Sequence, residues 1–356
     1  MNILHLFASR HWGGGEQYVF DLASRQMEAG HRLTLVSGDS KIIREKVAPL
    51  GCRYYTLKNR WHFNPFSIVA LRRIMAREQI AVAHAHQFRD AFIAVLAAQL
   101  LPAARRPKIV MTRHMISRGK NNFLYRYLYR HLDRLIFVSA IAQREFLLGA
   151  TVAPDKTAVV HNSVIPQRRP ATTDYRAQFT GGGRLLAGFI GALSPPKGVE
   201  LLLDAAERLR EKNVVFLLAG TGEDAYVNFL REQIRVRRLP VFLLGFLDNP
   251  HAFAAQMDVG VLPSLWREPF GLSILDFMSM GVPVITSNTG GQVEFVENEK
   301  TGLLVAPAVD AVAAALTRLL ADENLRHSLG ENARQAFAQQ FAYPIFYDKI
   351  MAIYGD

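Results

Sequence analysis

Residues 258–276 read DVGVLPSLWREPFGLSILD, a short apolar run that passes through a charged turn into a second apolar segment. The run DVGVLPS has the length and composition of a buried strand, and apolar periodicity resumes after the turn as a helix. Glu268, a proline and a glycine form the turn. A strand that leads through such a turn into a helix is typical of a parallel α/β sheet, which binds ligands at the carboxyl ends of its strands.

The same alternation of short apolar runs with helical patterns extends in both directions from this stretch. Further strands are predicted at LLAGFIGAL, NVVFLLAG, VFLLGF and PVITSN in the same half of the chain, and at NILHLF, RLTLVSG, AVAHAH, KIVMTR and RLIFVS in the first half. This rhythm predicts an α/β fold made of two Rossmann-like doubly wound domains that face each other across a cleft.

The rhythm breaks at VIPQRRPATTDYRAQFTGGG, which is polar, contains two prolines and ends in glycines. We therefore predict a first domain at 1–165, a linker at 166–183 and a second domain at 184–335. The remaining segment, 336–356, is predicted to be helical and to pack back on the first domain. A length of 356 residues with half of them hydrophobic is sufficient for two separate cores.

Composition narrows the possible classes of protein. The single cysteine, Cys52, excludes an internal disulfide and a zinc site built on thiolates, and suits a reducing compartment such as the cytoplasm. The sequence offers neither a secretory signal nor the roughly 18 uninterrupted apolar residues of a spanning helix. The net charge of +11 favours nucleic acid, anionic lipid or phosphorylated ligands as partners. We expect no nucleic acid, because no recognised reading module is present.

The positive charge is concentrated between residues 105 and 134, where nine basic residues face a single acid, Asp133. Apolar and aromatic residues lie between them, in a segment predicted to be helical: Phe123, Leu124, Tyr125, Tyr127, Leu128 and Tyr129. One interpretation is a helix that lies on an anionic membrane surface. The alternative is that the aromatic residues belong to the core and the arginines are merely solvated.

Two further glycine-containing turns follow predicted strands. In WGGGE at 12–16, Gly14 and Gly15 allow the backbone to approach a ligand at the positive end of a helix, although a plain tight turn explains them equally well. In IGALSPPKG, Lys197 stands where a helix opens, so it either neutralises a phosphate or is a solvated lysine.

The turn of the opening stretch is the more specific candidate. The backbone amides of Phe270, Gly271 and Leu272 can bind a phosphate, and Glu268 can accept hydrogen bonds from sugar hydroxyls. We expect Asp276 to lie two helical turns further on, about 11 Å away, and to meet another part of one elongated ligand such as a nucleotide sugar. The pocket for the base is predicted near Gly245, Phe246 and Leu247.

The remaining candidates are weaker. A glycine pair at 290 and 291, followed by Glu294 and Glu297, repeats the phosphate-or-sugar pattern, although Glu297 also fits a surface charge. His84, His86 and His114 lie near strand ends; we interpret them as structural, because a metal site would need carboxylate support that this segment does not offer.

Taken together, five motifs resemble those of the family 4 retaining glycosyltransferases, which have the GT-B fold. They occur in the order and approximate spacing of that family: WGGGE, IGALSPPKG, LAGTGE, DVGVLPSLWREPFGLSILD and SNTGGQVEFVENEKTGLLV. The resemblance covers nearly the whole chain and is closest from 188 to 305. It implies an acceptor-binding first domain, a nucleotide-sugar-binding second domain, and transfer without a metal or other cofactor.

The resemblance also implies roles for individual residues. Lys197 corresponds to the lysine that binds the diphosphate, Glu268 to the first glutamate of the Glu-x7-Glu motif, and the backbone of 270–272 to the binding site of the distal phosphate. Asp276 would hold the ribose, His114 would contact the donor sugar, and the first glycine loop would lie against the diphosphate. The implied partners are a nucleotide sugar, a glycan or lipid-linked acceptor in envelope polysaccharide or lipopolysaccharide synthesis, and the inner face of the cytoplasmic membrane.

Two positions depart from the family pattern. Asp276 replaces the second glutamate and is one methylene shorter, and Ala192 replaces an arginine that neutralises phosphate, a role that Arg267 or Arg113 can take over. These departures motivate an alternative function, a catalytically silent subunit or sensor that binds a nucleotide sugar without turnover.

Overall fold

The computed structural model describes residues 1–9, 13–57, 64–166, 173–179, 181 and 183–355. The chain divides into two compact units: unit 1 comprises Met1–Asn162 and Pro344–Asp356, and unit 2 comprises Ser163–Tyr343. Trp12 of the first glycine motif and residues 167–172, 180 and 182 of the predicted linker lie outside the described residues. None of the helices in the described ranges offers the uninterrupted apolar length that a bilayer-spanning segment needs.

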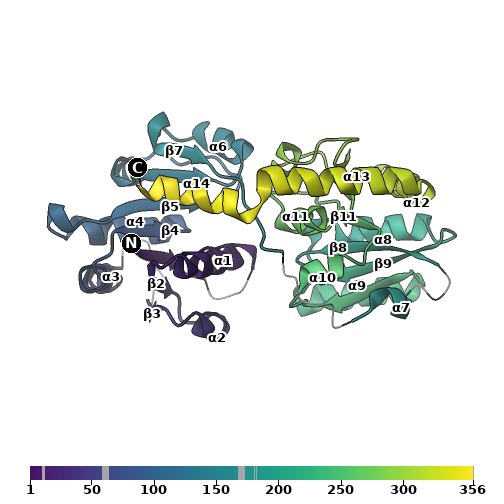
Figure 1. Cartoon of the computed structure of the whole chain (residues 1–356), viewed down its shortest axis with the longest axis horizontal. Coiled ribbons are helices and arrows are strands. Elements are labelled where there is room, and N and C mark those ends of the chain that lie inside the picture. The colour runs from purple at the N-terminus through teal and green to yellow at the C-terminus, as the bar shows by residue number, and fades with distance from the viewer. Residues whose placement is uncertain (10–12, 58–63, 167–172, 180, 182, 356) are drawn as a thin grey trace. The chain divides into compact units, whose positions relative to one another are not determined.

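Unit 1 is built on a seven-stranded parallel sheet with the order β3-β2-β1-β4-β5-β6-β7. Its strands are β1 (Asn2–Phe7), β2 (Arg32–Ser37), β3 (Arg53–Thr56), β4 (Val82–Ala85), β5 (Lys108–Arg113), β6 (Arg134–Phe137) and β7 (Thr157–Val159). Its helices are α1 (Gly14–Glu28), α2 (Lys41–Val47), α3 (Pro65–Arg77), α4 (Phe88–Gln99), α5 (Phe123–His131), α6 (Ala140–Leu147) and α14 (Tyr343–Gly355) (Figure 1).

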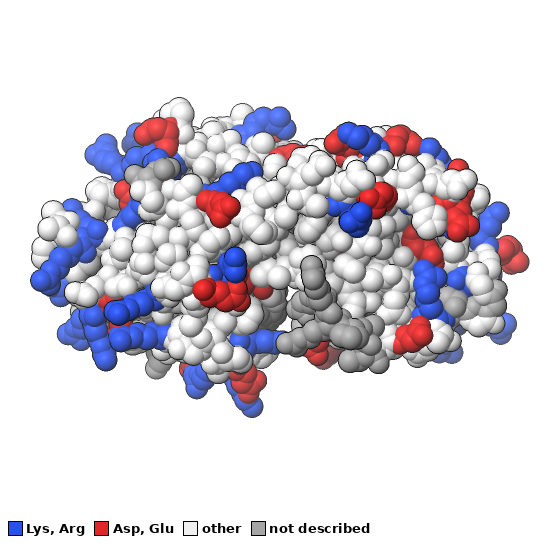
Figure 2. Space-filling model, viewed as in Figure 1, with Lys and Arg blue, Asp and Glu red and all other residues white. Residues whose placement is uncertain are grey.

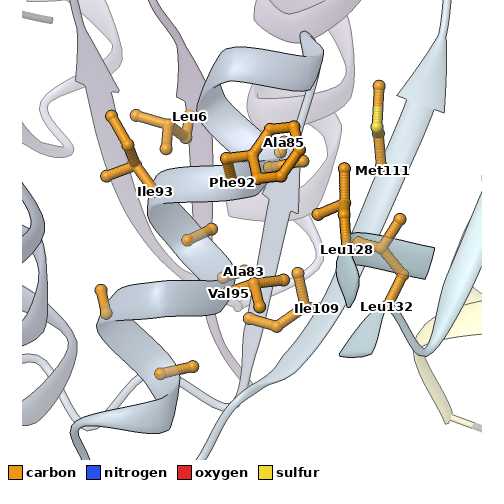
Figure 3. Close-up of a cluster of buried hydrophobic side chains, with 14 of the residues drawn as sticks. Leu6, Ala83, Ala85, Phe92, Ile93, Val95, Ile109, Met111, Leu128 and Leu132 are labelled. Carbon is orange, nitrogen blue, oxygen red and sulfur yellow. The ribbon is translucent and has the colours of Figure 1, made fainter. Parts of the chain in front are cut away.

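One face of this sheet is covered by α4. Figure 3 shows side chains of α4, among them Phe92 and Val95, lying against strand residues such as Ala83 and Met111. The small residues on both β4 and α4 let the helix approach the sheet closely, and the cluster is almost completely buried.

The opposite face carries polar residues because successive side chains of a strand point to alternate sides. His5 of β1 and His84 of β4 are direct neighbours in the parallel register, and both are fully buried. α1 and α14 cover this face: Gln26 of α1 contacts His5, and Tyr354 of α14 contacts His84. The last helix of the chain therefore helps to cover the sheet that begins with β1, the first strand.

Unit 2 is built on a six-stranded parallel sheet with the order β10-β9-β8-β11-β12-β13. Its strands are β8 (Leu185–Ile190), β9 (Val214–Ala219), β10 (Val241–Gly245), β11 (Val259–Leu262), β12 (Val284–Ser287) and β13 (Gly302–Val305). Its helices are α7 (Tyr175–Phe179), α8 (Val199–Arg208), α9 (Asp224–Val236), α10 (Pro250–Ala254), α11 (Leu272–Ser279), α12 (Val309–Ala321) and α13 (Glu323–Ala336).

Both sheets reverse their strand order once, between β1 and β4 in unit 1 and between β8 and β11 in unit 2. The prediction of two doubly wound α/β domains is thus confirmed. In open parallel sheets the carboxyl ends of the strands at such a reversal are where ligands bind. The loops that follow β8 and β11 carry Lys197 and Glu268.

Candidate functional site

The loop after β8 brings Lys197 next to the loop after β11. A short 3-10 turn, Pro195–Lys197, ends at Gly198, whose φ is +71°. A Cβ at that position would lie 2.1 Å from the backbone oxygen of Pro263, so only glycine permits this close approach. The two loops are therefore held together by backbone packing, before any side chain of the site is considered.

Lys197 and Glu268 form the centre of the site in unit 2. Lys197 Nζ lies 2.6 Å from Glu268 Oε1, and the same oxygen accepts hydrogen bonds from Ser264 Oγ and Trp266 Nε1, both at 2.8 Å. The Glu268 side chain is 5% exposed, whereas the Lys197 side chain is 24% exposed. Three donors on one carboxylate oxygen fix the position of Glu268, and through the ion pair they fix the ammonium group of Lys197 at an accessible place.

The start of α11 provides backbone donors. The side chain of Phe270 is buried and stacks on Phe295 at a ring distance of 4.5 Å, so it does not face a ligand. Gly271, with φ +100°, caps the helix. The amides of Leu272 and Ser273 have no hydrogen-bond partner within the described parts of the chain, as expected for the first turn of a helix. They form a positive end that can bind an anion.

The prediction that Asp276 lies two helical turns beyond Glu268 is wrong. The helix begins only at Leu272, so Asp276 is its fifth residue, because Pro269 and Gly271 keep the preceding residues in a turn. Asp276 is 7% exposed, and His251 Nε2 of α10 lies 3.2 Å from its Oδ1.

His251 stands beside this carboxylate without being aligned for a hydrogen bond. Burial lowers the pKa of His251 to about 4, so the ring is neutral near pH 7. Both ring nitrogens are buried, and neither has a hydrogen-bond partner of good geometry in the described residues. The ring of His251 that lies beside Asp276 is therefore neutral.

The glycine pair at 290 and 291 has a structural role. A Cβ on Gly290 would lie 2.6 Å from the backbone of Glu268. The amide of Gly291 donates to the backbone carbonyl oxygen of Glu268 at 2.7 Å. Glu297 is exposed and pairs with Lys300 at 2.8 Å. This motif therefore supports the backbone of Glu268, and the amide of Gly291 is already used within the fold.

The other predicted donor-side residues lie at the ends of neighbouring strands. Gly245 ends β10 with φ +76°, and a Cβ there would meet nothing within 4 Å. Phe246 follows and is 58% exposed. Ala192 and Arg267 are exposed on the loops after β8 and β11, whereas Arg113 belongs to unit 1, where it lies over the ring of Phe88 at 4.8 Å.

Three predicted site residues belong to unit 1. Gly14 and Gly15 are the first two residues of α1, and a Cβ on Gly15 would meet nothing within 4 Å. Packing thus does not require glycine at position 15. His114 follows β5 and is half-buried, with its Nε2 3.3 Å from His86 Nδ1. Burial, with the nearby charge of Arg113 as the second cause, lowers the pKa of His114 to about 4.

Within the described residues, His5, His84 and His86 form a group whose nitrogens come within 4.8 Å of one another, close enough to consider a metal. Each of their ring nitrogens instead has a hydrogen-bond partner in the protein. The sequence prediction found neither His5 nor the partners of the two carboxylates, Trp266 and His251. For Trp266 a signal existed, since it stands two positions before Glu268.

Two family models match the chain. The model described as glycosyl transferases group 1 matches residues 172–336, and the model described as Glycosyltransferase Family 4 matches residues 12–168. Among known relatives, the glycogen synthase of Mycobacterium tuberculosis is 31% identical over 279 residues, which are 73% of this chain and 65% of the synthase. The chain thus spans somewhat less than two thirds of that relative.

A second relative matches over more of its length. The Escherichia coli UDP-Gal:alpha-D-GlcNAc-diphosphoundecaprenol alpha-1,3-galactosyltransferase is 28% identical over 312 residues, 82% of this chain and 79% of that enzyme. Among solved structures, HepE of Anabaena in complex with UDP-glucose has a TM-score of 0.84 at 22% identity and covers 99% of this chain and 98% of its own. At that identity the likeness shows the fold, two Rossmann-like domains of the GT-B class.

Proposed function

The chain belongs to the family 4 glycosyltransferases, and from that premise we propose that it moves a sugar from a nucleotide-diphosphate sugar to a glycan or lipid-linked acceptor. The transfer retains the anomeric configuration and serves the synthesis of envelope polysaccharide or lipopolysaccharide. The observation that carries the proposal is the position of Lys197, held 2.6 Å from Glu268 Oε1 at the reversal point of the unit 2 sheet.

Lys197 and the first amides of α11 stabilise the leaving group. As the bond between the anomeric carbon and the phosphate oxygen breaks, negative charge grows on the diphosphate. The ammonium of Lys197 and the N–H groups of Leu272 and Ser273 then neutralise that charge from fixed positions. These groups come from the protein itself, so the proposed reaction requires no metal and no cofactor.

The acceptor hydroxyl attacks the anomeric carbon, and its proton passes to the departing phosphate oxygen. The proposal therefore assigns no side chain as nucleophile. Glu268 positions Lys197 and the donor sugar, Asp276 accepts hydrogen bonds from the ribose, and the surface near Gly245 and Phe246 receives the base. Gly14 and Gly15 approach the diphosphate, and His114 contacts the donor sugar.

The proposed acceptor is a sugar linked to a lipid diphosphate. This part rests on the E. coli relative, whose name specifies a diphosphoundecaprenol-linked acceptor and a UDP-galactose donor. Such an acceptor lies in a membrane, so the enzyme would have to work at a membrane surface. We place this work on the cytoplasmic face, which agrees with the single cysteine of the chain.

A basic patch on unit 1 supports this location. It consists of exposed cations on α5 and on the loop before it, Arg118, Lys120, Arg126 and Arg130. Figure 2 shows further Lys and Arg side chains over unit 1, at the end where Figure 1 labels α3 and α4. Each cation near an anionic bilayer contributes roughly 1 kcal/mol before salt screening.

The aromatic part of the predicted surface is smaller than the sequence suggested. Leu128 and Tyr129 lie in the core, and Leu124 and Tyr125 pack against it, because the inner face of α5 covers the sheet. Phe123, 72% exposed, and Tyr127 remain outside. Two further apolar residues, Leu147 and Leu148, are exposed at the end of α6. The amide of Gly119, in the loop before α5, donates to the backbone oxygen of Phe146 in α6 and so holds the two segments together. The patch is therefore mainly electrostatic.

Vesicle co-sedimentation tests the location. Binding should require anionic lipid, fall with salt and drop when the four cations of the basic patch are changed to glutamine together. A matched control changes four exposed cations of unit 2 to glutamine, Lys212, Arg231, Arg235 and Arg238. Equal binding to neutral and anionic vesicles, or equal losses in both variants, would defeat the proposed location.

The activity itself is tested with nucleotide sugars. A thermal-shift screen of nucleoside diphosphates identifies the base, because a ligand at about 100 times its dissociation constant stabilises the protein by ~2.7 kcal/mol. Sugars carried by that base are then offered with a lipid-diphosphate acceptor, and the product linkage is determined. Binding without transfer to any acceptor would instead favour the silent subunit, and inversion at the anomeric carbon would contradict retention.

A further inference from the structure

A buried hydrogen-bonded network, here called the histidine network, runs through unit 1 from the middle of its sheet to the carboxyl edge. Its members are His114, His86, His5, Gln26, Tyr354, His84 and Thr112. Strand alternation places these histidines on one face of the sheet, under α1 and α14. All except His114 are buried, and His114 is half-buried at the edge where ligands of such sheets bind.

The amide of Gln26 sets the direction of the hydrogen bonds. Its oxygen Oε1 lies 2.8 Å from His5 Nε2, and an amide oxygen can only accept, so His5 Nε2 carries the proton. The amide nitrogen faces the other way, toward the Tyr354 hydroxyl and toward Met351 Sδ at 3.8 Å. A sulfur and a hydroxyl are suitable neighbours for an N–H group, which favours this orientation.

The direction then propagates from ring to ring, because a neutral imidazole carries one N–H and one lone pair. His5 uses its Nε2 proton for Gln26, so its Nδ1 accepts from His86 Nε2 at 3.1 Å. His86 has then used its only proton, and its Nδ1 accepts from His114 Nε2 at 3.3 Å. The outermost ring, His114, therefore has its proton on Nε2 and its lone pair on Nδ1.

The second branch lies beside the first. The Tyr354 hydroxyl is 2.6 Å from His84 Nδ1, and His84 Nε2 is 2.7 Å from Thr112 Oγ1. A hydroxyl group can donate or accept, so this branch does not set the tautomer of His84. The rings are neutral near pH 7 because burial lowers the pKa of His5 and His114 to about 4 and holds those of His84 and His86 well below the ordinary value.

We infer that the histidine network is a positioning device that fixes His114 in the Nε2–H tautomer and presents its Nδ1 lone pair to a hydroxyl group of the donor sugar. Nδ1 has no hydrogen-bond partner in the described part of the chain, and the residue that carries it is half-buried. A ring nitrogen whose lone pair is fixed accepts a hydrogen bond from a hydroxyl group without first having to change tautomer. The choice of a sugar hydroxyl rests on the proposed function, whereas the tautomer rests on the hydrogen bonds alone.

The arrangement disfavours a metal ion in the same cluster. A metal bound by His5, His84 and His86 needs a lone pair from each ring. The lone pairs of His5 and His86 accept from His86 and His114, and that of His84 accepts from Tyr354 or Thr112. Binding would break three buried hydrogen bonds. Addition of Zn²⁺ is accordingly expected to leave the resonances of these histidines unchanged.

Long-range proton–nitrogen correlation spectra of the ¹⁵N-histidine protein report the tautomer of each ring directly. Near pH 7.5, His114 is expected to show a protonated Nε2 and an unprotonated Nδ1, with its signals assigned by their loss in His114→Asn. In Gln26→Leu, the amide that sets the direction is gone, and His114 should become a mixture of tautomers. In Gln26→Glu, an oxygen still accepts from His5, and the single Nε2–H tautomer should remain.

Tyr18→Phe is the matched control. The Tyr18 ring packs edge-on against His114 at 4.8 Å, and its hydroxyl makes only a 3.5 Å contact with Thr112. This variant keeps the packing and should leave the tautomer unchanged. An Nδ1–H tautomer in the wild type, one unchanged tautomer in both Gln26 variants, or Zn²⁺ bound by the cluster would overturn the inference. Should Gln26→Leu fail to fold, the wild-type spectrum and Gln26→Glu still decide.

Ligand binding separates this inference from the proposed function. If half of the molecules carry the wrong tautomer, Gln26→Leu should bind the nucleotide sugar about twofold more weakly, since apparent affinity scales with the competent fraction. Affinity for the nucleoside diphosphate, which lacks the sugar, should not change. A protein that shows the expected spectra but binds no nucleotide sugar retains the network and refutes the proposed function. If His114 of Gln26→Leu is a mixture of tautomers and this variant still binds the nucleotide sugar normally, the hydroxyl contact is refuted.

Discussion

Acidification from about pH 7.5 to about pH 5.5 is expected to destabilise unit 1 much more than unit 2. Four histidines of unit 1, His5, His84, His86 and His114, are held neutral because burial lowers their pKa values. In the unfolded chain the same side chains have a pKa of 6.5. Below that pH the unfolded state binds protons that the native state does not bind, so the free energy of unfolding falls as the pH falls.

The size of the effect follows from the two pKa values. One pH unit below 6.5, each buried histidine costs about 1.4 kcal/mol of stability, so four cost roughly 5 to 6 kcal/mol. Asp21 acts in the opposite direction: burial raises its pKa to about 6, so its protonation in the native state returns roughly 1 kcal/mol. A net loss of about 4 to 5 kcal/mol is a large part of a typical stability of about 5 to 15 kcal/mol. The loss levels off near pH 4, where the native His5 and His114 also begin to bind protons.

Amide hydrogen exchange followed by mass spectrometry can measure both units in one sample, after correction for the pH dependence of intrinsic exchange. Peptides from β1, β4 and β5 report on unit 1, and peptides from β8 and β9 report on unit 2. Among the described residues of unit 2, the one histidine whose pKa burial lowers is His251, which predicts a loss of only about 1.4 kcal/mol there. Equal losses in the two units, or a gain of stability in unit 1, would refute the reasoning.

Three substitutions test the donor side. Lys197→Ala should lower kcat by a factor on the order of 10² to 10³ in steady-state assays. It should also lower the melting temperature, because it leaves the buried carboxylate of Glu268 without its ion pair. Lys212→Ala, which removes an exposed lysine of the same unit, should change neither, and normal kinetics of the Lys197 variant would remove Lys197 from the site. Asp276→Ala should weaken nucleotide binding measured by calorimetry, whereas Asp276→Glu should keep or improve it. A crystal structure with the bound ribose far from position 276 would disprove the contact between Asp276 and the ribose. Gly15→Ala should fold as well as the wild type or be more stable by up to roughly 1 kcal/mol, because a Cβ there meets nothing within 4 Å. The variant should nevertheless bind the donor less tightly, and full donor affinity would show that no ligand approaches Gly15.

The fold was predictable because its signals are local. Buried parallel strands appear in the sequence as short apolar runs, and the family models confirm the resemblance that the motifs indicated. The strand orders of the two sheets were not predictable from such runs, since apolar runs do not say which strands are neighbours. Helix α5 shows a related limit. Its aromatic residues were interpreted as a membrane surface with a core as the alternative, and their burial depends on a sheet formed elsewhere in the chain.

For the site, the sequence predicted which residues take part better than it predicted how they are arranged. Lys197 and Glu268 were singled out by their positions after strands, and the structure places them 2.6 Å apart. The two helical turns predicted between Glu268 and Asp276 were wrong, because that prediction assumed a helix through a turn that contains proline and glycine. The histidine network was out of reach, since its contacts join residues 81 and 270 positions apart, and nothing near His5 in the sequence indicates its partners.

The return of α14 to unit 1 has a consequence for the order in which the nascent protein can mature. Ribosomes deliver residues 163–343, the whole of unit 2, before Tyr354, which closes the buried face over His84. Until Tyr354 emerges, the histidine-bearing face of the first sheet has only the cover that α1 provides, and the groups that α14 later buries stay exposed. Unit 2 can mature first although it is synthesised second, and during that interval the incomplete first unit is the part that a chaperone would have to shield.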